Sequence, residues 1–144
     1  MAHPALRPAD RLELTILVDN YTDLLLPGEG DLVRRARVAP PCAPLAEHGL
    51  ACLLRGSHAG IINTVGHAQR VTGVEHVHAV LGGFHLGGPL FESSIAPTVE
   101  AMQAIGPEHV VPMHCTGCAA IDRFAAAMPK QFLRNSVGTT YVFG

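Results

Sequence analysis

Short apolar runs alternate with helix-like segments along the C-terminal two thirds of this chain, and glycine or proline ends most of them. Val77–Leu81 and Val110–Met113 have the composition of buried strands. Gly60–Thr72 and Ile95–Ile105 carry apolar residues at helical spacing, with Pro97 expected in the first turn of the second helix. Strands that alternate with helices in this way predict an α/β fold built in layers.

A third helix and three further strands complete the expected arrangement. Thr116 is the predicted N-cap of the helix, because a threonine side chain there can accept from the free N–H groups of the first turn. Leu12–Val18, Leu50–Leu54 and Thr139–Phe143 are the predicted strands. The segment 28–44 contains several prolines and glycines and is expected to be mostly loop. We therefore expect a mixed sheet with helices.

The composition favours one globular domain without membrane or nucleic-acid partners. The chain has 144 residues, of which 48% are hydrophobic, enough for a single core spanning residues 1–144. No uninterrupted apolar stretch of about 18 residues occurs, so no membrane-spanning helix is expected. The N-terminus lacks a secretory signal, and a cytoplasmic protein is expected. A formal net charge of −2 and the absence of tryptophan argue against nucleic-acid binding.

Three of the nine histidines occupy the same position relative to the predicted strands. His58, His85 and His114 each follow the end of a buried strand, and they are 27 and then 29 residues apart. In open α/β sheets, ligands bind outside the carboxyl ends of the strands. A single loop histidine is more often a surface residue, but three in equivalent positions favour a metal site, since histidine is the commonest metal ligand.

The other histidines lack this equivalence. His76, His78 and His109 flank or lie in predicted strands, and we interpret them as structural. His67 lies on a predicted helix, and His3 lies close to the N-terminus. No ligand role is predicted for these five.

Two cysteines offer a different chemistry at the same edge. Cys115 and Cys118 form a C-x-x-C motif between a predicted strand and the start of a helix, as in thiol redox sites. Thiolates and imidazoles both suit zinc, so the pair could also supply ligands beside His114. Cys42 and Cys52 are interpreted as small buried hydrophobic residues.

Five segments together carry a resemblance to a known family. Leu17–Asp23, Ala46–Leu50, Ser57–Val65, Gly82–Leu86 and His114–Gly117 resemble, in this order, motifs of the metallo-β-lactamase-fold hydrolases. Within that superfamily they resemble the dihydropterin ribofuranosyl-aminobenzene phosphate synthases. The resemblance runs from about residue 12 to residue 143, nearly the whole chain.

One central block of that family has no counterpart here. Members carry a His-x-His-x-Asp-His signature before the motif that holds His58, and no segment of this chain matches it. The sequence reads like a family member with an internal deletion near Arg55. The resemblance therefore implies a truncated metallo-β-lactamase-like fold, or half of an αβ/βα sandwich. Half a sandwich would expose an apolar sheet face, so a homodimer is expected.

The resemblance also implies a hydrolytic metal site. His58 would belong to one metal position of a dinuclear site, and His85 and His114 to the other. Because such metals lie only about 3.5–4 Å apart, the three histidines could share one ion. Zinc is expected, with manganese, iron or magnesium as alternatives. The expected reaction is attack of metal-activated water on a phosphoester, ester or lactam in a small molecule, with weak or broad activity.

Supporting roles follow for some neighbouring side chains. Asp19, with Asp23 or Glu47 as alternatives, would orient water or a ligand histidine. His48 would fill a vacant ligand position or carry protons. A cluster of arginines is compatible with an anionic substrate as well as with a solvated loop: Arg34, Arg35 and Arg37.

Two other functions remain open on the sequence alone. The first is a metal-binding remnant or scaffold without catalytic activity. The second is a thiol redox protein that uses Cys115 and Cys118.

Overall fold

A four-stranded mixed sheet forms the centre of the structure. The computed structural model describes residues 12–18, 21–25, 42–45, 48–54 and 57–143. The strands of this sheet lie in the order β3-β4-β5-β6, with β3 antiparallel to β4 and the other two pairs parallel. Their bounds are Cys42–Leu45 for β3, Gly49–Leu54 for β4, Val77–Gly83 for β5 and His109–Met113 for β6.

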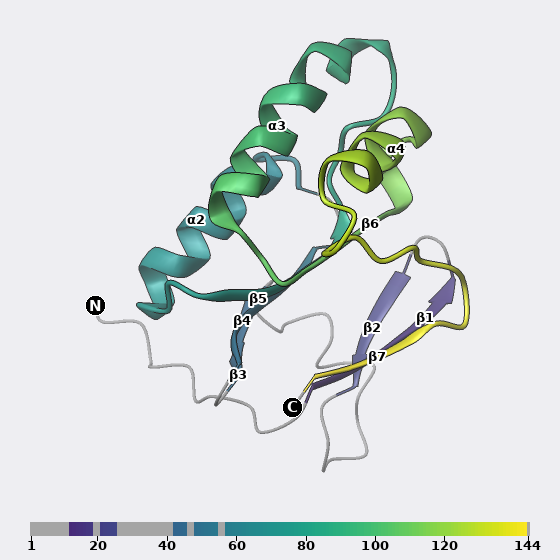
Figure 1. The fold of residues 1–144 in the computed structure, drawn as a ribbon. Helices are drawn as coiled ribbons and strands as arrows, with labels where there is room; N and C mark the ends of the chain where they lie inside the picture. The colour runs from purple at the N-terminus through teal and green to yellow at the C-terminus, as the bar shows by residue number, and fades with distance from the viewer. Residues whose placement is uncertain (1–11, 19–20, 26–41, 46–47, 55–56, 144) are drawn as a thin grey trace.

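A second sheet has three antiparallel strands in the order β2-β1-β7. These strands are β1 (Leu12–Val18), β2 (Tyr21–Leu25) and β7 (Thr140–Phe143). The sheet joins the two ends of the described chain, because β1 pairs with β7. Figure 1 shows it beside the four-stranded sheet, on the side away from the helices.

The helices in the described ranges cover one face of the four-stranded sheet (Figure 1). They are α2 (Ile61–Thr72), α3 (Glu92–Ile105) and α4 (Cys118–Ala127). Two short 3₁₀ turns, η1 (Pro89–Phe91) and η2 (His114–Thr116), connect strands to helices. None of the helices in the described ranges is both long and apolar enough to cross a membrane.

The main core fills the space between the sheet and the helices. Phe84 and Phe124 are fully buried there, with their ring centroids 5.3 Å apart in an edge-to-face arrangement. Val65 from α2 and Met102 from α3 complete the contact between the helical layer and β5. The apolar positions that predicted the helices from the sequence are therefore the positions that bury them.

A second, smaller cluster lies on the opposite face of the same sheet. Ala79, Leu81 and Val111 are fully buried there, and Tyr141 from β7 packs against them. The expectation of an exposed apolar sheet face is therefore wrong for these residues, since the same chain covers them. The homodimer was expected because this face would be exposed, and that reason does not apply to the covered residues. The homodimer itself stays a prediction.

Most of the expected elements are confirmed, with two corrections. The N-cap of α4 is Gly117, because the Thr116 side chain bonds elsewhere. Pro97 lies in the second turn of α3, since that helix begins at Glu92, directly after the η1 turn. The stretch 28–44, expected to be mostly loop, lies largely outside the described residues, and its last residues belong to strand β3, whose backbone pairs with β4. The expected deletion near Arg55 lies outside the described residues.

A substitution at Gly82 tests whether the close approach of β4 and β5 requires a residue without a side chain. Its φ is +130°, and a Cβ added there would lie 1.9 Å from the carbonyl oxygen of Leu54. We expect Gly82→Ala to lower the free energy of unfolding by roughly 3 kcal/mol or more, from backbone strain and overpacking together. Gly73→Ala is the control, because Gly73 has φ +71° with open space around it. It should cost only about 1 kcal/mol in urea denaturation; equal losses would contradict the proposed clash.

Candidate metal centre

The loops that carry the three predicted ligand histidines leave the sheet at one edge. Parallel pairing aligns the ends of the strands, with Leu54 opposite Gly82 and Gly83 opposite Met113. His58, His85 and His114 each follow one of these strand ends, within four residues. The prediction that the three loops share the carboxyl edge of β4, β5 and β6 is therefore confirmed.

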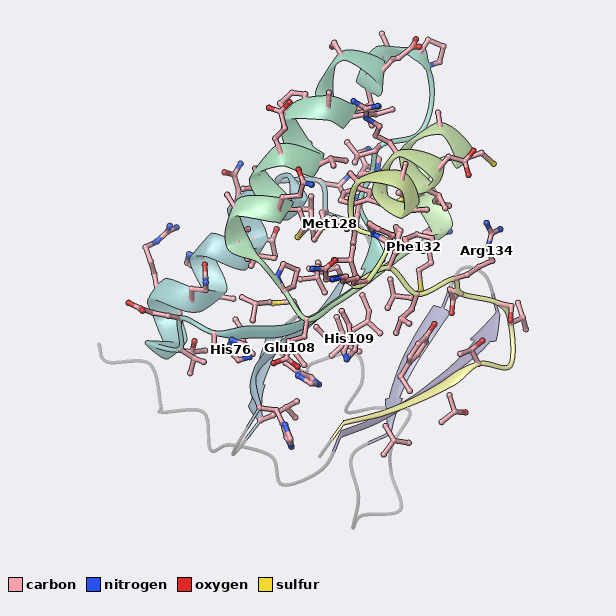
Figure 2. All side chains as sticks on the ribbon, viewed as in Figure 1. His76, Glu108, His109, Met128, Phe132 and Arg134 are labelled. Atoms are coloured by element: carbon pink, nitrogen blue, oxygen red, sulfur yellow. The ribbon has the colours of Figure 1, made fainter. Side chains whose placement is uncertain are left out.

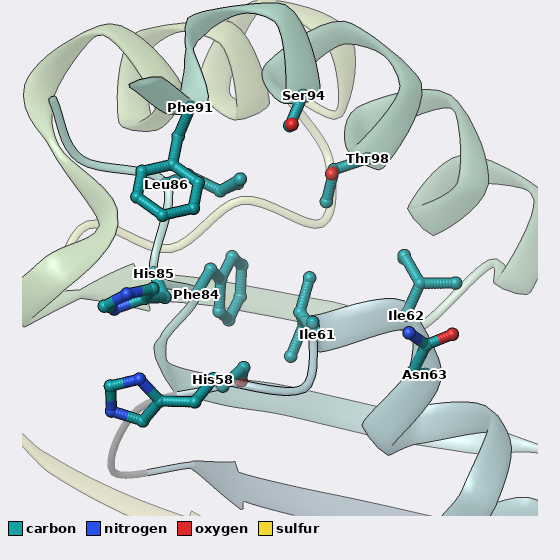
Figure 3. A pocket seen from close by; sticks show the side chains of 12 residues that line it. His58, Ile61, Ile62, Asn63, Phe84, His85, Leu86, Phe91, Ser94 and Thr98 are labelled. Atoms are coloured by element: carbon teal, nitrogen blue, oxygen red, sulfur yellow. The ribbon is translucent and has the colours of Figure 1, made fainter. Parts of the chain in front are cut away.

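Two of the histidines lie directly against each other. The ring centroids of His58 and His85 are 4.4 Å apart, with an angle of 49° between the ring planes. Phe91 from η1 packs against His85 in an edge-to-face arrangement, with ring centroids 5.1 Å apart. Figure 3 shows the two imidazoles side by side at one end of a pocket. Because zinc–nitrogen bonds are only about 2.0–2.1 Å long, two imidazoles that share an ion must lie close together, as these two rings do.

Two of the three histidines have a rare backbone conformation. His85 has a φ of 56° and His114 a φ of 52°, and they are the non-glycine residues with positive φ in the described chain. A side chain with a Cβ pays a steric cost in this left-handed region. Such residues cluster at active sites, because the surrounding structure must hold them there. The strain at both positions supports a functional role for these histidines.

Two buried hydroxyls tie the three loops together. Ser57 and Thr116 are the buried polar residues in the described part of the chain. The backbone N–H and hydroxyl of Ser57 both donate to the Gly83 carbonyl, at 3.1 and 3.2 Å. The Thr116 hydroxyl accepts from the Phe84 N–H at 3.1 Å and donates to the Met113 carbonyl at 2.7 Å. Each bond lies one or two residues from a predicted ligand, so together they position all three.

A pocket of about 290 Å³ opens beside the histidine pair, between α2 and α3. Ile61, Phe84 and Leu86 give it apolar walls. The side chains of Ser94 and Thr98 line it from α3 and point into the open space in Figure 3. The arrangement can hold a small molecule with both apolar and hydrogen-bonding parts next to His58 and His85.

The three histidines are not fully assembled as a ligand set. In the described ranges, one group of three metal-ligating side chains has all its ligand atoms within 4.8 Å of one another, and this group lies elsewhere. His114 is exposed at the start of η2. A site that uses all three imidazoles needs His114 to turn toward the other two.

Of the predicted supporting residues, His48 lies in the described part of the chain but not at this edge. Asp19 and Glu47 lie outside the described residues. His48 precedes β4, whereas His58 follows it, and the six residues of that strand span roughly 20 Å. His48 instead lies beside His78, with ring centroids 5.3 Å apart. The role assigned to His48 from the sequence, beside the other three histidines, is therefore not supported.

The C-x-x-C motif has the expected position between a strand and a helix. Cys115 is half-buried in η2, and Cys118 is exposed as the first residue of α4. Neither forms a disulfide. Cys115 lies next to His114 in the chain and remains a further candidate ligand.

The group whose ligand atoms all lie within 4.8 Å of one another is at the amino edge of the sheet. It consists of His78, Glu108 and His109. Sequence reasoning missed it, because these histidines were interpreted as structural. Burial lowers the pKa of His78, against the opposing effect of Glu108. A hydrogen bond from His76 is the main cause that lowers the pKa of Glu108. The sequence signal for this group is the alternation of His76 and His78 at a strand start, which places both histidines on one face of the strand.

Comparisons with known proteins place the chain in a structural context. No family model matches it. Over 101 residues, or 70% of its length, the chain is 33% identical to the 7,8-dihydropterin-6-methyl-4-(β-D-ribofuranosyl)-aminobenzene-5′-phosphate synthase of Methanocaldococcus jannaschii. The match covers 34% of that synthase, so the chain spans about a third of the relative's length.

The structure resembles the crystal structure of Tm1679, a metal-dependent hydrolase of the β-lactamase superfamily. The TM-score is 0.64 at 23% sequence identity, and the likeness covers 94% of this chain and 54% of that hydrolase. The chain therefore has the metallo-β-lactamase fold and contains about half of the larger protein's structure. The fold that the motifs implied is confirmed.

Thr116→Val tests the link between the loops of His85 and His114. The change keeps the side-chain shape but leaves the buried Phe84 N–H without an acceptor. We expect a loss of about 1–3 kcal/mol in the free energy of unfolding, measured by urea denaturation. Thr116→Ser keeps the hydroxyl and should lose clearly less. Equal losses in the two variants would show that the hydroxyl does not hold the loops.

Proposed function

We propose that this chain is a metal-dependent hydrolase that acts on a small molecule at the carboxyl edge of β4, β5 and β6. His58, His85 and His114 are the proposed ligands. The observation that carries the proposal is the left-handed backbone of His85 and His114, which both follow strand ends at this edge, where His85 also lines the pocket. The likeness to a metal-dependent hydrolase supports the same chemistry.

Zinc is the ion we propose, with manganese, iron and magnesium as alternatives. Imidazole ligands suit zinc and iron, whereas magnesium prefers oxygen ligands. A divalent ion, when bound, makes a coordinated water acidic and polarises the bond that is to be cleaved. The half-buried position of His85 under Phe91 limits the water around the pair, which strengthens electrostatic interactions there.

The chain's own residues would bind and orient the substrate. Ile61, Phe84 and Leu86 would hold an apolar part, and the hydroxyls of Ser94 and Thr98 would donate to or accept from polar groups. We propose a phosphoester, ester or lactam as the bond cleaved. The Cys115 thiol is close enough in sequence to His114 to supplement the ligands.

Turnover is expected to be weak or broad in specificity, because the His-x-His-x-Asp-His ligands of the superfamily are missing from the sequence. The name of the archaeal relative describes a synthase. Since the chain spans about a third of that protein, we propose hydrolysis rather than that synthesis.

Asparagine substitutions test the ligands without disturbing the backbone. Asparagine tolerates positive φ better than most residues but is a poor zinc ligand. We expect His58→Asn and His85→Asn each to lower kcat/KM by at least about 100-fold, a larger loss than is usual when a residue that only orients a metal ligand is changed. The assay uses phosphodiester, phosphotriester and β-lactam substrates with and without added zinc, on protein purified without a histidine tag.

His67→Asn is the matched control, because His67 is exposed on α2 away from the pocket. It should leave activity unchanged. Metal bound at this edge without turnover of any substrate would favour the inactive remnant. Activity that survives a chelator would refute the hydrolase.

A further inference from the structure

A second set of histidines gathers at the opposite edge of the four-stranded sheet, where β4, β5 and β6 begin. The backbone holds these strand starts together, because the Leu50 N–H donates to the His76 carbonyl at 2.9 Å and the Glu108 N–H to the Val77 carbonyl at 3.2 Å. Figure 2 shows His76, Glu108 and His109 next to one another, on the side of the sheet away from the helices. The neighbouring side chains are thus brought into one cluster from the starts of two strands, β5 and β6.

The ligand atoms of this cluster are already close. Those of His78, Glu108 and His109 all lie within 4.8 Å of one another. The Nδ1 of His78 is 2.8 Å from Oε2 of Glu108, and the rings of His78 and His109 meet edge to face with centroids 5.3 Å apart. No rearrangement of the backbone is needed to bring the three donors onto one ion.

An irregularity in β5 aims His78 at this cluster. Leu50 pairs with Val77 and Ala51 pairs with Ala79, which leaves His78 as an extra residue in the pairing. Such bulges re-aim a side chain and are common next to functional sites. The side chain of His78 is 12% exposed, so the sheet places an imidazole in a largely water-free position.

Within the described chain, a ring nitrogen of His109 lacks a hydrogen bond at the same place. The Nδ1 of His109 is buried and has no hydrogen-bond partner among the residues that the structure describes. Buried polar atoms are nearly always satisfied, and an exception calls for an explanation such as an ion. A hydrogen-bonded pair of His78 and Glu108 alone would leave this nitrogen unexplained.

We propose that His78, Glu108 and His109 form a second metal site, which binds a divalent ion of the zinc class. Two imidazoles and one carboxylate are a ligand set that zinc accepts, whereas calcium and magnesium require more oxygen ligands. His48, whose ring centroid is 5.3 Å from that of His78, is the nearest candidate for a fourth ligand. This site is independent of the proposed hydrolytic site at the other edge.

His76 has a positioning role in this site. Its Nε2 is 2.8 Å from Oε1 of Glu108, the oxygen that does not face His78. A carboxylate that is hydrogen-bonded on one oxygen presents the other in a fixed direction, as in many metal sites. His76 thereby orients Glu108 without ligating the ion.

The function of the ion is to clamp the strand starts. It joins β5 to β6, and β4 through His48, at an edge that no described helix covers. An ion that binds the folded state alone stabilises that state by mass action. Its removal should therefore lower the melting temperature rather than only the activity.

The experiment removes the first site before it examines the second. A full chain without a tag, with His58, His85 and His114 all changed to Asn, is titrated with Co²⁺ and then Zn²⁺. We expect one equivalent of Co²⁺ to bind with the intense visible absorption of a four-coordinate site. Zn²⁺ should displace it and raise the melting temperature, and excess Mg²⁺ should not. Absence of cobalt and zinc binding at micromolar concentration in this folded variant would overturn the proposal.

Single changes in that background identify the ligands. His109→Asn should abolish the absorption, and Glu108→Gln, at a side chain that is 48% exposed, should weaken binding at least about tenfold. Because Glu108 is partly exposed, Glu108→Gln should fold even if His109→Asn does not. Circular dichroism checks the folding of each variant. His67→Asn is the matched control and should leave binding unchanged. Loss of binding in the control, or full binding in both ligand variants, would refute the assignment.

Discussion

The parallel pairing of β4, β5 and β6 is the constraint on which the rest of this structure depends. Each pair places the ends of two strands at the same level, with Gly83 opposite Met113 at one edge and Ala79 opposite His109 near the other. Loops that are distant in sequence thus share an edge of the sheet, where they can contact one another. The helices that return the chain between strands add the apolar layer that keeps the register fixed.

Buried hydrogen bonds then convert this register into a defined site. Ser57 bonds to the end of β5, and Thr116 bridges the residues next to His85 and His114. Because both hydroxyls are buried, each bond would leave a dehydrated polar group if it broke. This cost keeps the loops in place and allows two histidines to hold a left-handed backbone that would otherwise relax.

The sequence predicted the helices and the parallel strands well, because their apolar spacing is the spacing of the core. It also placed His58, His85 and His114 at one edge, since strand ends follow directly from strand positions. It could not show that His58 and His85 touch while His114 points to solvent, because side-chain direction depends on φ values such as that of His114. His78 was missed for a similar reason: the pairing irregularity that re-aims it depends on the β4–β5 register.

The two edges of the sheet differ in a way that suits different tasks. At the carboxyl edge the three histidines lie on loops: His85 and His114 have a strained backbone, His58 and His85 line a pocket, and His58 and His114 are exposed. Such a site leaves room for a substrate and for movement of a ligand. At the amino edge the imidazoles of His78 and His109 extend from the strands themselves, and a carboxylate already lies between neighbouring histidines. A closed ligand set on rigid strands favours an ion that stabilises, whereas an open set on loops favours one that reacts.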